Sequence, residues 1–415
     1  MASTESKQAT GKSTVTPTTG GITAPAGFKT AGVHCGIKAS PSALDLAVLT
    51  ADTPASAAAL FTTNLAQAAP VLVSKKHIEQ SHGIAKAVVV NSGCANACTG
   101  DSGMEHARRM AEETASAVGC TPDQVLVAST GVIGVGLKID RVVAGIRAAT
   151  AAMTRGGGSD AARAIMTTDP FPKECAVLVE TPGGTFTVGG MAKGSGMIEP
   201  NMATMLGFLT TDAKVSPSLL RRALQESARD TFNAITVDGE CSTNDVLFAM
   251  ASGASGVVID DASYPALLEG LLTVSKELAL GIVRGGEGAT KLIAVTVADA
   301  ATVDAARQVA RTIANSLLVK TAVHGADPNW GRILAASGRA GVPFDVSRAT
   351  VHVGGILMFE KGLPHDEAAP LVAEHMKGTE VQIDMNLGSG GGASATIWTC
   401  DLSAEYVRIN GEYRT

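Results

Sequence analysis

A glycine- and proline-containing loop near the middle of the chain runs directly into an apolar stretch, KGSGMIEPNMATMLGFLTTD, residues 193–212. Gly194 and Gly196 let the backbone adopt conformations that other residues disfavour. Pro200 restricts one further backbone dihedral and disfavours helix immediately before it. After Thr204 the sequence turns apolar, as a strand entering a core does. The pattern predicts a flexible loop that delivers one hydroxyl, that of Thr204, to the start of a rigid element.

The hydroxyl of Thr204 is placed to cleave the chain at the Ala203–Thr204 bond. Attack on the carbonyl of Ala203 through a five-membered ring would shift the acyl group from nitrogen to oxygen, and hydrolysis of the ester would leave Thr204 as a new N-terminus. An α-amine has an ordinary pKa of about 7.7–8.0, so it would serve as a general base. Threonine needs such a base because it is a weak nucleophile alone. Taken by itself, Thr204 would be an ordinary residue that caps a strand, as a lone threonine nearly always is.

Length and composition indicate a globular protein. The 415 residues suffice for two domains or one large multilayer core. Hydrophobic residues make up 45% of the chain and charged residues 17%, which excludes a disordered protein. Aromatics are only 3%, so small residues must do most of the packing. The net charge of −6 argues against a nucleic-acid or anionic-membrane partner.

Targeting and metal-binding signals are weak. Residues 1–26 lack the apolar core of a secretory signal, and no apolar stretch reaches the ~20 residues that span a membrane. We expect residues 1–26 to be a disordered tail and the protein to be cytoplasmic, which the seven scattered cysteines also suit. Cys94 and Cys98 with His106 lack the second cysteine pair typical of zinc sites, so we expect no metal.

Apolar runs and turn residues predict the main elements. We expect strands at 45–50, 56–62, 85–91 and 124–129, a hairpin at 175–180 and 185–190, and helices at 104–118, 216–232, 264–283 and 365–376. The strand at 124–129 ends in Thr130-Gly131. A glycine turn there would expose backbone N–H groups that hold a developing oxyanion, although a tight strand–helix turn explains it as well.

The central stretch resembles the self-processing region of the ornithine acetyltransferase (glutamate N-acetyltransferase) family. That family carries the pattern KG-x-GM-x-x-P-x-MAT-[ML]-L, and every fixed position is present from Lys193 to Leu206. Further family-like motifs follow in order between about Gly27 and Thr415. The resemblance implies self-cleavage into an α chain covering residues 27–203 after the tail and a β chain covering 204–415.

The resemblance also implies a set of site residues. Thr204 would be the nucleophile and, through its new α-amine, the base, while Ala203 would be the carbonyl side of the cleavage site. From the motifs STGVIG, MTTD, GEGATK and the C-terminus it assigns an oxyanion hole to Thr130 and Gly131, and substrate contacts to Thr167, Lys193, Thr204, Glu287, Asn410 and Thr415. Pro170 stands where the family usually has Thr. The segment ITVDGECSTND, residues 235–245, also departs from the family at Glu240 and Cys241; because a turn explains it equally well, we assign it no role.

The resemblance implies transfer of an acetyl group from N2-acetylornithine to glutamate through an acetyl-Thr204 intermediate, without a cofactor. It implies a layered α/β/β/α sandwich, an additional smaller α/β region at about 320–415, and an α2β2 assembly. A self-processing amidohydrolase or aminopeptidase that passes the acyl group to water is the main alternative. A non-enzymatic small-molecule binder with an intact chain is another. Use of acetyl-CoA as a second acetyl donor stays open.

Overall fold

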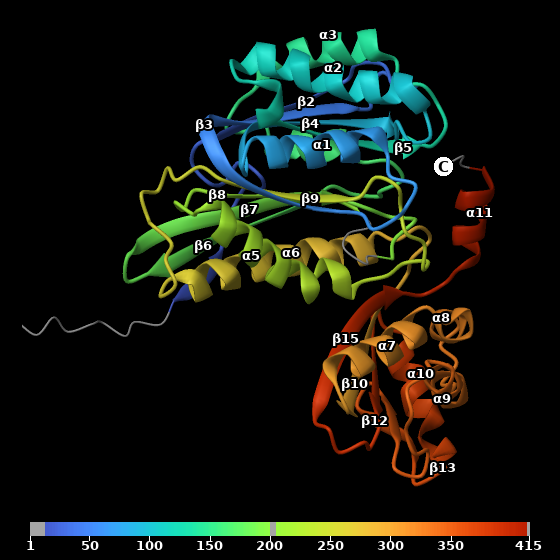
Figure 1. Ribbon diagram of the computed structural model, residues 1–415. Helices are drawn as coiled ribbons and strands as arrows, with labels where there is room; N and C mark the ends of the chain where they lie inside the picture. Colours follow the sequence, from blue (N-terminus) through green and yellow to red (C-terminus); the bar gives the residue numbers. More distant parts are fainter. Residues whose placement is uncertain (1–12, 200–204, 413–415) are drawn as a thin grey trace, which may run out of the picture.

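The computed structural model describes residues 13–199 and 205–412 (Figure 1). Within these ranges the chain forms a nine-stranded sheet in its larger part and a six-stranded sheet in the C-terminal part. The strands of the larger sheet are β1 (Thr14–Pro17), β2 (Phe28–Val33), β3 (Leu46–Phe61), β4 (Ile84–Cys94), β5 (Val125–Val132), β6 (Lys173–Thr181), β7 (Gly184–Lys193), β8 (Leu206–Thr211) and β9 (Val246–Ala251). Its helices are α1 (Ala69–Gln80), α2 (Gly100–Val118), α3 (Ile139–Ala152), α4 (Gly158–Ala164), α5 (Pro217–Arg229) and α6 (Tyr264–Arg284).

Strand β3 connects two layers of the larger sheet. Its first half pairs with β2 and β4, and its second half pairs with β9, with a register shift between Thr50 and Ala55. The two strands expected at 45–50 and 56–62 are therefore one long strand. The polar residues between these runs lie where the pairing with β4 is irregular, which is why they suggested a break.

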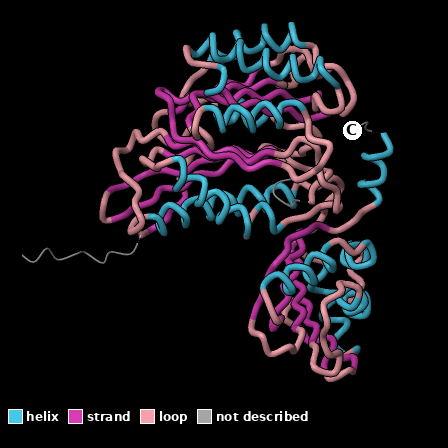
Figure 2. Tube along the Cα trace, viewed as in Figure 1, coloured by secondary structure: helices cyan, strands magenta, loops and turns pink. Residues whose placement is uncertain are grey.

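The larger part is an α/β/β/α sandwich, as expected. Helices α2 and α3 cover one layer, and α5 and α6 cover the other (Figures 1 and 2). Along β3, Ala47 and Leu49 face the core between the layers, whereas Leu46 and Val48 face the core beneath α2 and α3. Because both faces of these strands are covered, they read as continuous apolar runs.

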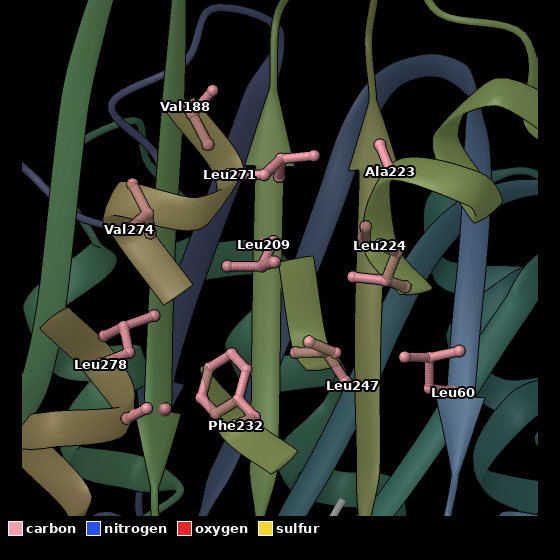
Figure 3. Close-up of a cluster of buried hydrophobic side chains, with 14 of the residues drawn as sticks. Leu60, Val188, Leu209, Ala223, Leu224, Phe232, Leu247, Leu271, Val274 and Leu278 are labelled. Carbon is pink, nitrogen blue, oxygen red and sulfur yellow. The ribbon is translucent and has the colours of Figure 1, made fainter. Parts of the chain in front are cut away.

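The core beneath α5 and α6 is made mainly of aliphatic side chains (Figure 3). Leu209 of β8 and Leu247 of β9 point into it, opposite Leu224 of α5 and Leu278 of α6. The residues that precede them by one position or follow them by one, such as Phe208 and Phe248, face the core between the layers. Strand β8, expected from the apolar run after Thr204, thus lies in the middle of the sandwich between β7 and β9.

The C-terminal region contains β10 (Leu292–Ala300), β11 (Thr350–Val353), β12 (Ile356–Glu360), β13 (Leu363–Pro364), β14 (Glu380–Asn386) and β15 (Ala393–Cys400), with α7 (Val303–Ala314), α8 (Leu317–His324), α9 (Trp330–Gly338) and α10 (Ala369–Met376). It starts near residue 292, so the expected boundary near 320 was wrong. Strand β10 lies inside this sheet, between β14 and β15. Helix α11 (Ala404–Glu412) leaves this region and returns to the larger part (Figure 1).

The expected tail also extended too far into the chain. Strand β1 pairs antiparallel with β6 over residues 14–17, so part of 1–26 belongs to the sheet; residues 1–12 lie outside the described ranges. Three of the four residues of β1 are exposed, and main-chain pairing at a sheet edge leaves no apolar pattern to detect. The expected hairpin of β6 and β7 and the long helix α6 are confirmed. No helix in the described ranges is long and apolar enough to cross a membrane.

Candidate active site

A cavity of about 310 Å³ lies where the end of β7 and the start of β8 meet helix α11. The end of β5, the loop before β9 and the loop after α6 complete its wall. Six of the site residues expected from the sequence line it: Thr130, Gly131, Thr167, Lys193, Glu287 and Asn410. The structure therefore brings together residues from five separate elements and loops around one space.

Lys193, the last residue of β7, joins two of the expected threonines. Its Nζ donates to Oγ1 of Thr167 at 2.7 Å and to Oγ1 of Thr130 at 3.3 Å. The side chain is 10% exposed, and its ammonium lies 3.9 Å from the carboxylate of Asp169. A single buried cation thus orients two hydroxyl groups at the cavity wall.

Asp169 anchors this arrangement from behind. Its fully buried carboxylate accepts hydrogen bonds from Lys173 Nζ at 2.7 Å and from the backbone N–H groups of Gly194 (2.7 Å) and Thr167 (3.0 Å). Burial alone raises the pKa of Asp169, but the lysines and hydrogen bonds outweigh it and lower the pKa to about 2. Burial lowers the pKa of Lys173, which has fewer compensating partners. The adjacent Pro170 is exposed and leaves these contacts intact.

The Thr130–Gly131 turn requires glycine at its second position. Gly131 has φ of +125°, a conformation that side chains disfavour. A Cβ atom at this position would also clash with the backbone of Gly93 and Cys94 on the neighbouring strand β4. The pairing of β4 with β5 shifts register at this point, so the end of β5 opens toward the cavity.

Glu287 forms the carboxylate end of the cavity. Only 5% exposed, it accepts hydrogen bonds from Oγ1 of Thr168 and Nδ2 of Asn410, each at 2.7 Å. Gly196 packs directly against its carboxylate, where a larger residue would clash. Within the described residues no lysine or arginine forms an ion pair with Glu287, so its charge faces the cavity with neutral partners only.

Two further carboxylates hold the segment that leads into residue 200. Asp238 accepts hydrogen bonds from the consecutive backbone N–H groups of residues 197 and 198, at 2.7 and 2.8 Å. Glu199 binds Arg311 of α7 at 3.0 Å and the Nδ2 of Asn315 at 3.0 Å. The segment is therefore fastened both to the loop before β9 and to the C-terminal region.

Three expected site residues, Ala203, Thr204 and Thr415, lie outside the described residues. Described residues that lie close to them in the sequence line the cavity. Met205 and Leu206 line it at the start of β8, and Asn410 lines it from α11, which ends at Glu412.

Sequence reasoning missed several residues of the site. Asp169 belongs to the MTTD motif, but its partners are distant in sequence. Asp238 and Asp245 belong to residues 235–245, to which we assigned no role. Tyr406 carries no motif signal; its hydroxyl donates to Asp238 at 3.2 Å, and burial together with that carboxylate raises its pKa.

No group of three or more His, Cys, Asp or Glu side chains suited to a metal ion occurs in the described part of the chain. Cys94, considered above as a possible ligand, is buried and directs its thiol to the carbonyl of Val135 at 3.3 Å. The cavity instead offers an ammonium, carboxylates, hydroxyls and amides. This set suits the binding of an amino acid or a derivative of one.

Comparisons with known proteins identify the family to which the chain belongs. The model of the ArgJ family matches residues 29–415. Proteins named arginine biosynthesis bifunctional protein ArgJ from Symbiobacterium thermophilum and Thermosynechococcus vestitus are 51% and 49% identical, covering 95% and 96% of this chain and 99% and 98% of their own. A crystal structure of the Bacillus halodurans protein of that name, 39% identical, covers 51% of this chain and 100% of its own, with a TM-score of 0.49. The chain belongs to the ArgJ family of arginine-biosynthesis acetyltransferases.

Proposed function

We propose that the chain cleaves itself between Ala203 and Thr204 and then transfers the acetyl group of N2-acetylornithine to glutamate. The observation that carries this proposal is the meeting of opposite charges beside the start of β8. Met205, one residue after Thr204, lines the same cavity as the ammonium of Lys193 and the carboxylate of Glu287.

The substrates explain why both charges are needed. Ornithine derivatives carry a cationic side-chain amine, for which the carboxylate of Glu287 is a suitable partner. Both acetylornithine and glutamate carry carboxylates, for which Lys193 is a suitable partner. Thr167 and Asn410 orient these two charged groups through the hydrogen bonds described above.

The chemistry proceeds through two acyl transfers. The hydroxyl of Thr204 gives its proton to the α-amine and attacks the acetyl carbonyl; the amide C–N bond breaks, and ornithine leaves with that proton. The neutral amine of glutamate then attacks the acetyl ester; the C–O bond to Thr204 breaks, a proton of the attacking amine passes through the α-amine to the Thr204 oxygen, and N-acetylglutamate leaves. Thr130 and Gly131 stabilise the negative oxygen in both tetrahedral states. Glutamate enters after ornithine has left, so ping-pong kinetics follow.

After cleavage, the two chains, ending at residue 203 and beginning at residue 204, stay together. Strand β8 of the second chain pairs with β7 of the first, from Leu206↔Lys193 to Thr211↔Val188. Its other neighbour is β9, and its side chains are fully buried. Dissociation of the chains would expose the apolar side chains of this strand to water. The free energy of that exposure is far larger than the entropy gained by breaking one peptide bond. We also propose that two copies of each of these chains form an α2β2 assembly. We propose the cytoplasm as its location.

Intact mass spectrometry of the purified protein tests the cleavage. The wild type should give two masses that sum to the full chain plus one water, the second beginning at Thr204. Thr204→Ala should stay as a single chain of 42.0 kDa, whereas the matched control Thr204→Ser, which keeps a hydroxyl, should be cleaved. An uncleaved wild type would remove the amine base and with it the proposed mechanism.

Product analysis tests the transfer. Release of ornithine from acetylornithine should depend on glutamate and be matched by an equal amount of N-acetylglutamate. Release of ornithine and free acetate without glutamate would instead identify the amidohydrolase alternative.

A second activity is proposed because the curated relatives are named bifunctional. Acetyl-CoA is the acetyl donor that we propose for it, with glutamate as the acceptor. Formation of N-acetylglutamate from acetyl-CoA and glutamate, without acetylornithine, would support this activity; its absence under conditions where the ornithine exchange runs would rule it out.

A further inference from the structure

Thr168 lines the cavity, and the proposed mechanism gives it no role. Its Oγ1 donates to Oε1 of Glu287 at 2.7 Å. The hydroxyl of the preceding residue, Thr167, accepts a hydrogen bond from Nζ of Lys193, also at 2.7 Å. Two adjacent hydroxyl groups therefore contact the carboxylate and the ammonium of one cavity, so the backbone that joins them links the positions of the two charges.

The position of Thr168 is fixed from the interior of the protein. The next residue, Asp169, has a carboxylate that is 0% exposed and accepts the backbone N–H of Gly194, directly after β7, at 2.7 Å. The backbone N–H of Glu287 donates to the carbonyl of Ser195 at 3.0 Å. Both loops are therefore tied to the segment that follows β7, and the hydrogen bond from Thr168 to Glu287 joins two loops that are already held in place.

Asn410, the second donor to Glu287, comes from a more weakly packed element. Its Nδ2 donates to Oε2 of Glu287 at 2.7 Å and to the carbonyl of Tyr406 at 3.0 Å. Both hydrogens of this amide group are thus engaged, and its Oδ1 is an acceptor. Helix α11, which carries Asn410, contributes no buried residue. Thr168 is therefore the donor on the more firmly held element.

Glu287 keeps the capacity for one more donor on each carboxylate oxygen. Such an oxygen can accept two hydrogen bonds, and in the described part of the chain Oε1 receives the bond from Thr168 and Oε2 the bond from Asn410. Both donors are neutral, so they orient the carboxylate and leave its negative charge uncompensated. A carboxylate that is only 5% exposed is costly without a cationic partner. The site therefore suits a primary ammonium group, which brings a charge and three donors.

We propose that Thr168 is a positioning residue that sets specificity for the cationic side chain of acetylornithine. Its hydroxyl holds the carboxylate of Glu287 toward the side-chain amine of that substrate. The inference rests on the proposed function and adds to it a residue that acts through Glu287. Glutamate carries no cationic side chain, so the contact should matter for one of the two substrates only.

Thr168→Val tests this role, because valine has nearly the same size as threonine and lacks the hydroxyl. Ping-pong kinetics yield kcat/KM for acetylornithine and for glutamate separately from one set of initial rates. We expect the value for acetylornithine to fall about tenfold or more, since a hydrogen bond to a charged group is lost. The value for glutamate should stay within about twofold of the wild type. Equal falls for both substrates, or no fall for acetylornithine, would overturn the inference.

A double variant tests whether Thr168 acts through Glu287. Adding Thr168→Val to Glu287→Gln should lower kcat/KM for acetylornithine by no more than about twofold beyond Glu287→Gln alone, because the charge that Thr168 orients is already absent. A further fall of about tenfold would show that Thr168 acts independently of Glu287 and would contradict the proposed role.

Two single variants serve as controls. Thr168→Ser keeps the hydroxyl and should retain most of the wild-type kcat/KM for acetylornithine. Thr150→Val removes a half-buried hydroxyl of α3 that donates to the carbonyl of Ile146 at 2.7 Å outside the cavity, and it should leave both values unchanged. A serine variant as weak as Thr168→Val, or the same selective loss in Thr150→Val, would refute the inference.

Intact mass is measured for every variant before the kinetics. A Thr168→Val chain that does not cleave would place Thr168 in self-cleavage instead of amine recognition and would overturn the inference. A wild type that does not cleave, or that releases ornithine without glutamate, would refute the proposed function itself. The wild-type measurements therefore separate the two failures.

Discussion

Replacing Asp169 by Asn should strongly destabilise the protein, because it leaves the ammonium of Lys173 buried without its counter-ion. The two side chains are 0% and 2% exposed, and their charged atoms are 2.7 Å apart. Removing one partner of a buried ion pair typically costs ~3–5 kcal/mol of unfolding free energy. The depression of the Asp169 pKa from 3.8 to about 2 corresponds to about 2 kcal/mol for the charged form, a consistent order of magnitude.

The pH dependence of this contribution has a definite sign. The pKa of Asp169 is lower in the folded state than in the unfolded state, so its contribution is fully present above pH ~4 and disappears as the pH falls toward 2. As the pH falls from about 4 to 2, the unfolding free energy of Asp169→Asn should therefore decrease less than that of the wild type.

Urea unfolding at one fixed protein concentration, followed by circular dichroism at pH 7, measures the effect. The double variant Asp169→Asn/Lys173→Met serves as the control, because it removes the uncompensated charge and should recover at least half of the loss. Two results would refute the reasoning: a loss below about 1 kcal/mol in the single variant, or strictly additive effects in the double variant.

Three further variants test the cavity. Glu287→Gln keeps the shape but removes the charge, so kcat/KM for acetylornithine should fall about 10- to 100-fold, and an unchanged value would exclude an ionic contact with substrate. Thr130→Val should lower kcat by about 10²-fold with little change in the KM of acetylornithine, if its hydroxyl stabilises the oxyanion; a change in KM alone would contradict that role. Gly196→Ala should resemble Glu287→Gln, because its Cβ displaces that carboxylate, whereas Gly338→Ala, which has open space around it, should leave kcat/KM unchanged.

The layered core could be predicted from the sequence because its signals are local. Successive residues of β3, β4 and β5 point to opposite faces of the sheet and are apolar on both faces. This pattern indicates strands that are buried on two sides. The length of α6 and the turn between β6 and β7 could also be predicted from the sequence. The joining of two runs into β3 and the early start of the C-terminal sheet at β10 were missed, because both depend on which strands pair across long sequence separations.

Some residues of the site could likewise be identified from the sequence, and others could not. The motifs singled out Thr130, Lys193 and Glu287 individually, and the structure lines one cavity with them. Neither Asp169 nor Thr168 could be selected from the sequence, because their importance lies in partners that the chain brings from elsewhere.

The sequence by itself determined the family, the family-like motif around Thr204 and the apolar pattern that builds a layered core, since each is a matter of residue type and short-range spacing. Only the tertiary structure decided that Lys193 binds Thr167, that Asn410 from the last helix meets Glu287, and that Thr168 donates to the same carboxylate. Such contacts depend on strand register and on how distant elements pack, and these follow from the free energy of the whole chain and not from any local pattern.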